Sequence, residues 1–321
     1  MSRRALLTGI TGQDGWYLAE LLVAQGYEVF GVVRSDDTAP APPDVRIVEG
    51  DLTDASSLRK VMSVSTPSEV YNLAGVSSVA LSWEEPMLTA DVNGLGVLRL
   101  IEAVRELQAS IGSPVRIVQA SSAEIFGNAA APQDEVTPIA PVTPYGAAKA
   151  FAQHLIAVYR KAGVSASSAI LYNHESPRRP PSFVTRRITR GVARIARGSS
   201  EPLRLGNLEA RRDWGFAGDY VRALHLIAQH PEPDDFVVAT GVSHSVADFV
   251  QAAFAHVGID DWQSRVEVDP NFIRPTDPGE QRGDVTKTRS VLGWEPKVDF
   301  AEMIGAMVDA DLAYQGAGDE R

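Results

Sequence analysis

The stretch TGITGQDGWYLAE, residues 8–20, constrains the fold of this chain more than any other segment. An apolar run at residues 4–8 precedes it, and a helical pattern follows over residues 16–25. Glycines spaced G-x-x-G-x-x-G between a strand and a helix permit a tight turn, backbone approach to a pyrophosphate and close helix–sheet packing. Residues 27–33 supply the next strand at the right distance, which favours a dinucleotide site over a glycine-rich turn of another α/β protein.

Further strands and helices alternate along the first half of the chain. Residues 45–48, 69–73 and 115–119 have the pattern of buried strands, and residues 55–64 that of a helix. The apolar positions between Val92 and Leu107 also recur at helical spacing. This alternation predicts an α/β fold with a doubly wound parallel (Rossmann) sheet.

Beyond residue 172 the predicted elements become shorter and more mixed. A strand at 235–240 and helices near 246–257 and 300–314 are the clearest of them. We expect residues 1–172 to form the NAD(P)-binding Rossmann domain. We expect residues 173–321 to form largely a smaller mixed α/β substrate lobe, with segments of about 211–245 returning to the sheet.

Composition excludes several classes of protein. A net charge of −11 over 321 residues argues against nucleic acid as a partner, although a local basic pocket for a phosphorylated ligand stays possible. The chain has no cysteine, so disulfides, thiolate metal sites and cysteine nucleophiles are excluded, and no metal site is expected. No run reaches the ~18 apolar residues of a membrane span. A reducing cytoplasm is compatible with these features and is the expected location.

The end of the second predicted strand bears on the choice of cofactor. Arg34 and Ser35 come first and favour the 2′-phosphate of NADP, whereas Asp36 and Asp37 count against a second negative charge and leave NAD open. Asp51, after the third strand, could bind an adenine amino group or cap the next helix; Asp54 fits the cap better. Further cofactor-binding candidates are the residues of the glycine turn and of two strand ends: Gly9, Thr11, Gly12, Gln13, Asp14, Gly15, Leu52, Leu73 and Ala74.

Four side chains able to move protons follow the fifth strand. Tyr145 and Lys149 are spaced i, i+4 and share one helix face, where an ammonium can lower the pKa of a phenol and make it a usable base. Ser122 and Glu124 lie at the strand's carboxyl end, where open α/β sheets bind ligands. Glu124 is a second base that a plain reductase does not need; alternatively it caps a turn or pairs with an arginine.

These motifs together resemble the extended short-chain dehydrogenase/reductases that act on nucleotide sugars, and within them the GDP-mannose 4,6-dehydratase family. The resemblance extends over nearly the whole chain. Its most specific segments are NHESPRR (173–179), FVTRRIT (183–189) and RRDWGFAGDYV (211–221), with QASSAEIFG (119–127) and PYGAAK (144–149).

The resemblance implies a mechanism for a hydro-lyase with tightly bound NADP, and NAD is the alternative cofactor. Tyr145 would take the proton of the sugar C4 hydroxyl as hydride passes to the nicotinamide, and Lys149 would hold the nicotinamide ribose. Glu124 would then remove the C5 proton, water would leave from C6, and hydride would return there. Ser122, at the position of the family's threonine, would hydrogen-bond the C4 oxygen. The product would be GDP-4-keto-6-deoxy-mannose.

The resemblance also implies further binding residues. His174, which alternatively is only a packed histidine, and Arg179 would lie on the cofactor, and Asn173 would contact cofactor and substrate. The substrate residues would be Ser77, Glu124, Asn173, Val184, Arg187, Arg212, Arg274 and Asp277. Arginine forks suit a pyrophosphate.

Departures from the family pattern keep alternatives open. The segment after Arg34 is short, which puts a tetramer in doubt and leaves a homodimer through helices near 94–107 and 146–161 as the expectation. Pro180 and Pro181 replace a usual glycine, and Asp277 a usual glutamate. Another GDP-sugar such as a GDP-heptose is an alternative substrate, an NAD(P)H-dependent reductase of a GDP-4-keto-6-deoxy sugar is an alternative enzyme, and a catalytically inactive sugar-binding protein is the third hypothesis.

Overall fold

The computed structural model describes residues 3–272 and 279–314. Its centre is a seven-stranded sheet in the order β10-β6-β5-β4-β1-β2-β3, and every paired neighbour is parallel. The order reverses between β1 and β4, which is the position where open α/β sheets bind ligands at their carboxyl edge. The strands are β1 Arg4–Thr8, β2 Glu28–Val33, β3 Val45–Glu49, β4 Glu69–Asn72, β5 Arg116–Ala120, β6 Ala166–Leu171 and β10 Asp235–Val238. The predicted fold class is confirmed.

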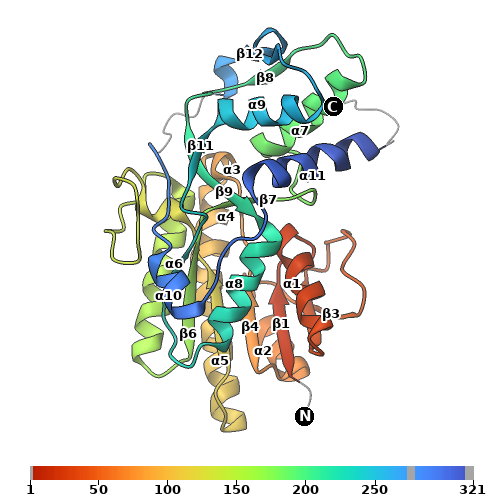
Figure 1. Ribbon diagram of the computed structural model, residues 1–321. Helices are drawn as coiled ribbons and strands as arrows, with labels where there is room; N and C mark the ends of the chain where they lie inside the picture. Colours follow the sequence, from red (N-terminus) through yellow and green to blue (C-terminus); the bar gives the residue numbers. More distant parts are fainter. Residues whose placement is uncertain (1–2, 273–278, 315–321) are drawn as a thin grey trace.

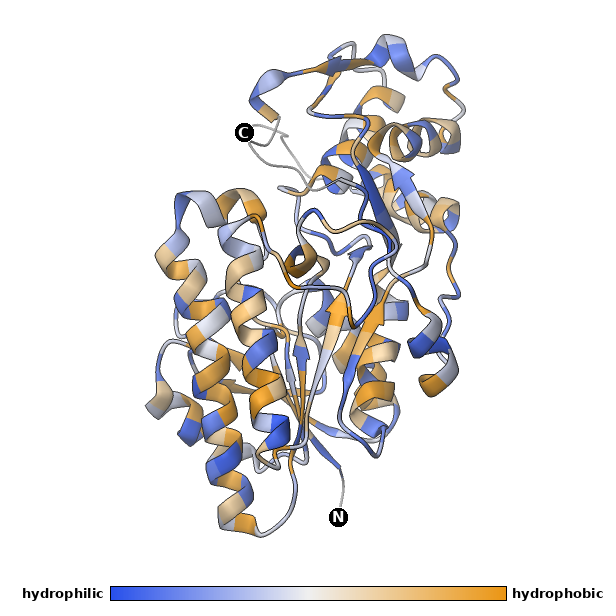
Figure 2. Ribbon diagram, turned by 90° about the vertical axis from the view of Figure 1, so that its left-hand side faces the viewer, coloured by the Kyte–Doolittle hydropathy of each residue, from blue (hydrophilic) through white to orange (hydrophobic). Residues whose placement is uncertain are grey.

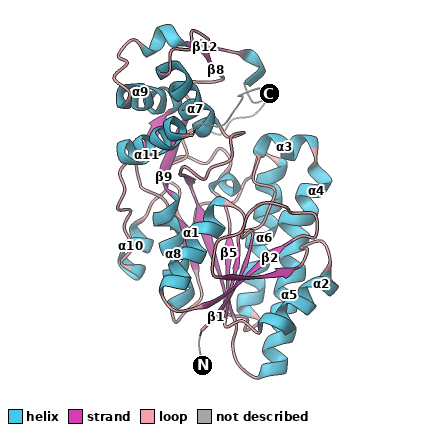
Figure 3. Cartoon of the chain, turned by 90° about the vertical axis from the view of Figure 1, so that its right-hand side faces the viewer, coloured by secondary structure: helices cyan, strands magenta, loops and turns pink. Residues whose placement is uncertain are grey.

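Helices cover both faces of this sheet (Figure 3). Successive strand residues point to opposite faces, so Val70 and Ile117 pack with α2, α5 and α6, whereas Tyr71 and Val118 pack with α1 and α8. These helices are α1 Gln13–Ala24, α2 Ala55–Ser65, α5 Gly96–Ile111, α6 Pro144–Lys161 and α8 Ala217–Gln229, and the short α10 Thr286–Leu292 contacts β10. Two apolar layers therefore fix the sheet rigidly.

Two helix starts differ from the sequence expectation. The first helix begins at Gln13 rather than at Trp16. Its first turn is polar and shows no apolar periodicity, so the sequence pattern did not reveal this start. The predicted helix from Val92 begins as a π-helical turn, Asp91–Leu95, before α5 starts at Gly96. The N-cap prediction for α2 is confirmed, since the Asp54 side chain accepts a hydrogen bond from the amide of Ser56.

A second, smaller lobe lies above the carboxyl edge of the sheet (Figure 1). Its apolar core joins three helices, with Phe249, Met307 and Trp214 among the buried side chains. Its elements are α7 Val184–Ala196, α9 Val246–His256 and α11 Phe300–Ala313, a three-stranded sheet of β7 Asn173–Glu175, β9 Arg211–Phe216 and β11 Ser243–Ser245, and the pair β8 Leu203–Leu205 with β12 Val266–Val268. Between these elements α8 and β10 return to the main sheet, so the two parts interleave along the chain.

The remaining elements are short, and they lie partly beside the space between sheet and lobe and partly within the lobe itself. They are α3 Val79–Glu84 and α4 Pro86–Ala90, with 3-10 turns at Ala123–Phe126, Trp262–Arg265 and Pro270–Phe272. Strands of the main sheet carry strongly apolar colouring, whereas the long strand that enters the small lobe is hydrophilic (Figure 2). Within residues 3–272 and 279–314, no helix combines the length and hydrophobicity that crossing a bilayer would require.

Candidate active site

The glycine turn after β1 has the geometry that a dinucleotide cradle needs. Gly9 has a φ of +69°, and a Cβ there would lie 2.8 Å from the amide nitrogen of Ala74. A Cβ on Gly15 would lie 2.3 Å from the carbonyl oxygen of Gly9. Gly12 is the N-cap of α1, whose positive end therefore faces the turn without a side chain over it. The predicted cofactor residues of this turn fit a pyrophosphate.

A cleft of about 570 Å³ lies between the carboxyl edge of the sheet and the small lobe. It brings together residues from both halves of the chain. The predicted residues on its wall are Asp14, Leu73, Ser77, Ser122, Glu124, Tyr145, Lys149, Asn173, His174, Arg179, Val184, Arg187 and Arg212. Others lie beyond this wall, at the glycine turn and the ends of neighbouring strands: Gly9, Thr11, Gly12, Gln13, Gly15, Arg34, Asp51, Leu52 and Ala74.

Tyr145 and Lys149 occupy the first turns of α6, which begins after the N-cap Thr143. Lys149 is buried, and its Nζ donates to the carbonyl oxygen of Ala120 at 2.8 Å and lies 5.8 Å from the centre of the Tyr145 ring. Burial lowers the pKa of Lys149 to about 8. The helix thus presents both side chains to the cleft, as the i, i+4 spacing predicts.

The pKa of Tyr145 differs from the sequence expectation. Burial raises the pKa of its phenol to about 12, opposed by a hydrogen bond with Ser122 and reinforced by the charge of Glu124. The expected lowering by Lys149 is not found, because its Nζ is directed to the carbonyl of Ala120 and not to the phenol oxygen. The protein alone therefore keeps Tyr145 protonated at neutral pH, and its use as a base requires further positive charge nearby.

Ser122 and Glu124 start the 3-10 turn that follows β5. The Ser122 hydroxyl caps this turn by accepting from the amide of Glu124 at 3.2 Å. The Glu124 side chain is 8% exposed, and its Oε1 accepts from the Gln281 amide at 3.4 Å. A hydroxyl, a phenol and a carboxylate thus converge on one wall of the cleft.

Asp14 and His174 form an ion pair across the floor of the cleft. His174 Nε2 lies 2.9 Å from Asp14 Oδ2, its Nδ1 lies 2.7 Å from the carbonyl oxygen of Tyr172, and its ring stacks on Tyr220 at 4.8 Å. Burial opposes the charge on both groups, but their mutual attraction and hydrogen bond prevail, so the pKa of Asp14 is lowered and that of His174 raised. His174 is thus a packed histidine whose ring also lines the cleft.

A second connection joins the glycine turn to the segment after β7. Gln13 Nε2 donates to the carbonyl oxygen of His174 at 3.1 Å, and the Ser176 hydroxyl donates to Gln13 Oε1 at 2.7 Å. Glu175 accepts from Thr185 at 2.7 Å and pairs with Arg179 at 3.2 Å. The NHESP segment is therefore held by α1 on one side and by α7 on the other.

The predicted residues around the adenosine end make mainly local contacts. Arg34 pairs with Asp36 at 3.1 Å on the surface, and the Thr11 hydroxyl donates to Asp37 at 3.0 Å. Asp51 Oδ1 accepts from both the amide and the hydroxyl of Thr53, at 2.7 and 2.8 Å. Asp51 therefore orders its own turn with that oxygen, a role that the sequence expectation did not include.

The small lobe contributes the basic side of the cleft. Val184 and Arg187 lie in the first turn of α7, and the Arg187 guanidinium stacks on Phe272 at 4.1 Å. Arg212 is buried, and its Nη1 donates to the carbonyl oxygens of Arg211 and Gly279 at 2.8 and 3.0 Å. Arg274 and Asp277, predicted to bind substrate, lie outside the described residues.

Several residues on the cleft wall were missed by sequence reasoning. Gln281 contacts Glu124, and Phe272 supports Arg187. Trp83, Asn207 and Asn271 also line the cleft. Their positions depend on long-range packing, and only Phe272 carried a local signal, since it directly precedes the IRP motif.

The fold and the site together define a nucleotide-sugar enzyme of the short-chain dehydrogenase/reductase class. The solved structure of UDP-glucose 4-epimerase from Thermus thermophilus in complex with NAD superimposes with a TM-score of 0.84 at 29% identity, covering 97% of this chain and 99% of that one. UDP-glucose 4-epimerase from Thermotoga maritima with UDP-glucose gives 0.84 at 26% identity over 96% and 98% of the two chains. A nicotinamide cofactor follows from this likeness and from the cradle.

Sequence comparison narrows the class to one family. The profile described as GDP-mannose 4,6 dehydratase matches residues 6–307. GDP-mannose 4,6 dehydratase 1 of Arabidopsis thaliana is 47% identical over 323 residues, which cover 96% of this chain and 89% of that protein. The Homo sapiens GDP-mannose 4,6 dehydratase is 42% identical over 340 residues, covering 96% and 91%. The chain belongs to the GDP-mannose 4,6-dehydratase family, which confirms the resemblance drawn from its motifs.

Proposed function

We propose that this protein is a hydro-lyase that converts GDP-mannose to GDP-4-keto-6-deoxy-mannose. The observation that carries the proposal is the position of Glu124 in the same cleft as Ser122, Tyr145 and Lys149. A carboxylate there adds a second base to the pair that handles the C4 hydroxyl. Elimination of water needs that base, because the C5 proton must be removed while the C6 hydroxyl leaves.

Tyr145 and Ser122 act at the C4 oxygen of the sugar. A bound nicotinamide dinucleotide supplies the reversible oxidant, and the positive charge of its ring favours the phenolate of Tyr145. Tyr145 accepts the proton of the C4 hydroxyl, and Ser122, which shares a hydrogen bond with the phenol, holds the C4 oxygen. Lys149, anchored on Ala120, fixes its ammonium beside the Tyr145 ring.

Glu124 acts in the step that follows. A ketone at C4 acidifies the hydrogen at C5, and the Glu124 carboxylate takes that proton and passes it to the departing C6 hydroxyl, which leaves as water. Glu124 as a whole residue is 8% exposed, so bulk water competes weakly for its carboxylate. The Glu124 carboxylate is thereby regenerated, and C5 receives the proton that Tyr145 took from the C4 hydroxyl, which is a solvent-exchangeable position.

The GDP part occupies the side of the cleft formed by the small lobe. The guanidinium groups of Arg187 and Arg212 supply positive charge to the diphosphate, and their planar forks suit its oxygens. Val184 offers an apolar surface to the guanine ring of GDP. Arg274 and Asp277 are added to the proposed substrate-binding residues on the family pattern alone.

We propose NADP as the cofactor. The support is Arg34 at the end of β2, whose side chain is 60% exposed and is the first charged group after the strand. The residues that hold the dinucleotide are those of the glycine turn, with Leu73 and Ala74 beneath them and Asn173, His174 and Arg179 toward the nicotinamide. Mass spectrometry of the nucleotide released from the purified protein distinguishes NADP from NAD.

We also propose a homodimer through α5 and α6. Three apolar side chains on or beside these helices are exposed, namely Leu95 at 44%, Phe151 at 44% and Val158 at 60%. Light scattering coupled to size exclusion should give twice the chain mass. Replacing Phe151 and Val158 by Glu should shift the mass toward that of one chain, and a tetramer in the unmodified protein would contradict the proposal.

The deciding assay for the activity is incubation of the purified protein with GDP-mannose. Mass spectrometry should show a product lighter by one water, and no net oxidation or reduction of added nucleotide should accompany it. Stoichiometric consumption of NADPH would point to a reductase instead. An unchanged substrate mass with cofactor present would refute the proposed reaction for GDP-mannose.

A further inference from the structure

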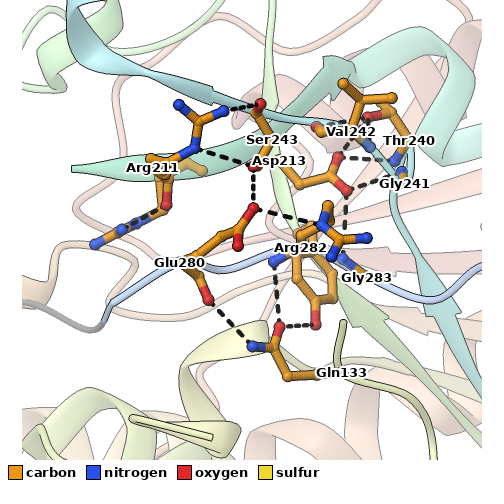
Figure 4. Close-up of polar contacts among 12 residues, drawn as sticks. Gln133, Arg211, Asp213, Thr240, Gly241, Val242, Ser243, Glu280, Arg282 and Gly283 are labelled. Carbon is orange, nitrogen blue, oxygen red and sulfur yellow. Dashed lines mark hydrogen bonds and ion pairs between the residues drawn. The ribbon is translucent and has the colours of Figure 1, made fainter. Parts of the chain in front are cut away.

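Residues 279–284, which we name the strap, lie between β9 and the segment that carries Gln133 (Figure 4). On one side the amide of Asp213 donates to the carbonyl oxygen of Gln281 at 2.9 Å. On the other side Gln133 and Arg282 exchange two bonds, from the Gln133 amide to the Arg282 carbonyl at 2.9 Å and from the Arg282 amide to Gln133 Oε1 at 3.2 Å. The backbone of Gln281 is therefore fixed from both flanks.

The buried carboxylate of Asp213 strengthens this attachment. Its Oδ2 accepts from the amides of Gly241 at 2.8 Å and Gly283 at 3.3 Å, and its Oδ1 accepts from Thr240 (Figure 4). The strap also packs closely at Gly283, where an added Cβ would lie 2.5 Å from Cβ of Ala239, so a side chain there would displace the strap. A fixed strap can position a side chain with the accuracy that a catalytic site requires.

The side chain of Gln281 points from the strap into the active-site cleft. It is 2% exposed, and its Nε2 donates to Oε1 of Glu124 at 3.4 Å. The two residues are 157 positions apart in the chain, so only the tertiary fold brings them together. Within the part of the chain that the structure describes, no hydrogen bond joins the strap to Tyr145 or Lys149, so the bond from Gln281 connects the strap to the proposed base.

We propose that Gln281 is a positioning residue for Glu124: its amide orients the carboxylate and favours the ionised form, and so sets the pH range in which the base works. This inference rests on the proposed dehydratase activity. A neutral donor suits the task, because it stabilises a buried carboxylate without the large loss of basicity that a lysine or arginine partner would cause. An apolar residue in its place would leave that oxygen buried with one donor fewer.

Other ionisable groups line the same cleft as Glu124, and they come from several elements. They are Tyr145 and Lys149 on α6, Asp14 on α1, His174 and Glu175 on β7, Tyr172 before β7, Arg179 after it, Arg187 on α7, Arg212 on β9 and Glu84 on α3. Each of these groups stays in place when Gln281 is replaced. A comparison of variants at position 281 therefore isolates the contribution of the amide.

The test compares Gln281→Leu with the unmodified holoenzyme over a range of pH. The acidic limb of the kcat profile for dehydration of GDP-mannose should move up by about one pH unit, equivalent to a tenfold weaker acid, while KM changes less than about threefold. Gln281→Glu should move the limb further, because two adjacent carboxylates share a proton. Gln153→Leu, at a buried glutamine of α6 outside the cleft wall, is the matched control and should leave the limb unchanged.

A second readout does not depend on activity. The carboxyl ¹³C resonance of Glu124, assigned by its loss in Glu124→Gln, should titrate about one unit higher in Gln281→Leu than in the unmodified protein. An unmoved acidic limb together with an unmoved titration would overturn the role of Gln281. If the unmodified enzyme fails to dehydrate GDP-mannose, the proposed function fails, and the titration alone still decides whether Gln281 acts on Glu124.

Discussion

The ion pair of Asp14 and His174 gives the sharpest prediction about how the site is held together. We expect the double-mutant cycle of Asp14→Asn and His174→Phe to reveal a large coupling between the two positions. Phenylalanine keeps an aromatic ring for the stack on Tyr220 at 4.8 Å, so the cycle removes the charge and the hydrogen bond but little packing. The pair joins the glycine turn to β7, and its loss should loosen the cofactor cradle.

The expected magnitude follows from the geometry. The atoms lie 2.9 Å apart, and the side chains are 11% and 21% exposed. At an effective dielectric constant near 20 the attraction is about 6 kcal/mol, and desolvation cancels most of it. A net coupling of about 1.5–3 kcal/mol remains for a charged hydrogen bond. In a domain of this size each kcal/mol moves the melting temperature by roughly 2 °C.

The pH dependence gives the coupling its own signature. The pKa of His174 is raised, so its share of stability is complete below the ordinary value of 6.5 and is lost as pH rises through the folded-state pKa. The pKa of Asp14 is lowered, so its share is present above 3.8 and is lost as pH falls through the folded-state pKa. Coupling should therefore be larger near about pH 5.5 than near about pH 9.

Thermal unfolding of the four proteins at both pH values measures this coupling. The exposed pair Arg204 and Glu267, whose side chains are 59% and 58% exposed, provides the control and should show a coupling below about 0.5 kcal/mol at either pH. A coupling for Asp14 and His174 that is as small as the control, or that is the same at both pH values, would refute the reasoning.

Three further predictions concern single residues. Lys149→Met should abolish dehydration yet raise the melting temperature. The pKa of Lys149 in the folded protein, about 8, lies below the ordinary 10.5, so its buried ammonium costs stability. The stability that the Met variant gains is therefore complete below pH 8 and fades as the pH rises toward 10.5. A lower melting temperature of the variant at pH 7 would contradict this. Arg34→Ala should weaken binding of NADP by about tenfold and of NAD by less than twofold in calorimetric titration, and equal losses would argue against a 2′-phosphate contact. Asp213→Ala should destabilise the fold by about 3 kcal/mol or more, because the donors of Thr240, Gly241 and Gly283 lose a buried acceptor; denaturant unfolding that gives under 1 kcal/mol would show that water replaces it.

Local patterns account for the parts of the site that sequence reasoning predicted. The glycine turn lies within one strand–turn–helix unit, so the spacing of Gly9, Gly12 and Gly15 already determines which backbone atoms approach each other. Tyr145 and Lys149 share a face because helical geometry alone places i and i+4 together. The family motifs then located Arg187 and Arg212 on the same cleft.

The features that escaped prediction depend on contacts between distant segments. Nothing near Gln281 in the sequence indicates that a strap delivers it to Glu124. The pKa of Tyr145 rises because burial, which depends on the whole fold, outweighs any neighbour four residues away. Lys149 binds the Ala120 carbonyl, a partner 29 positions earlier, for the same reason.

The central claim is that Glu124 removes the C5 proton, and dehydration of GDP-mannose in D₂O by the unmodified enzyme and by Glu124→Gln tests it most directly. The unmodified enzyme should give a product lighter by one water with deuterium at C5. Glu124→Gln should bind GDP-mannose with similar affinity but form product at least about 100-fold more slowly. Undiminished dehydration by Glu124→Gln, with deuterium still entering C5, would contradict the assignment.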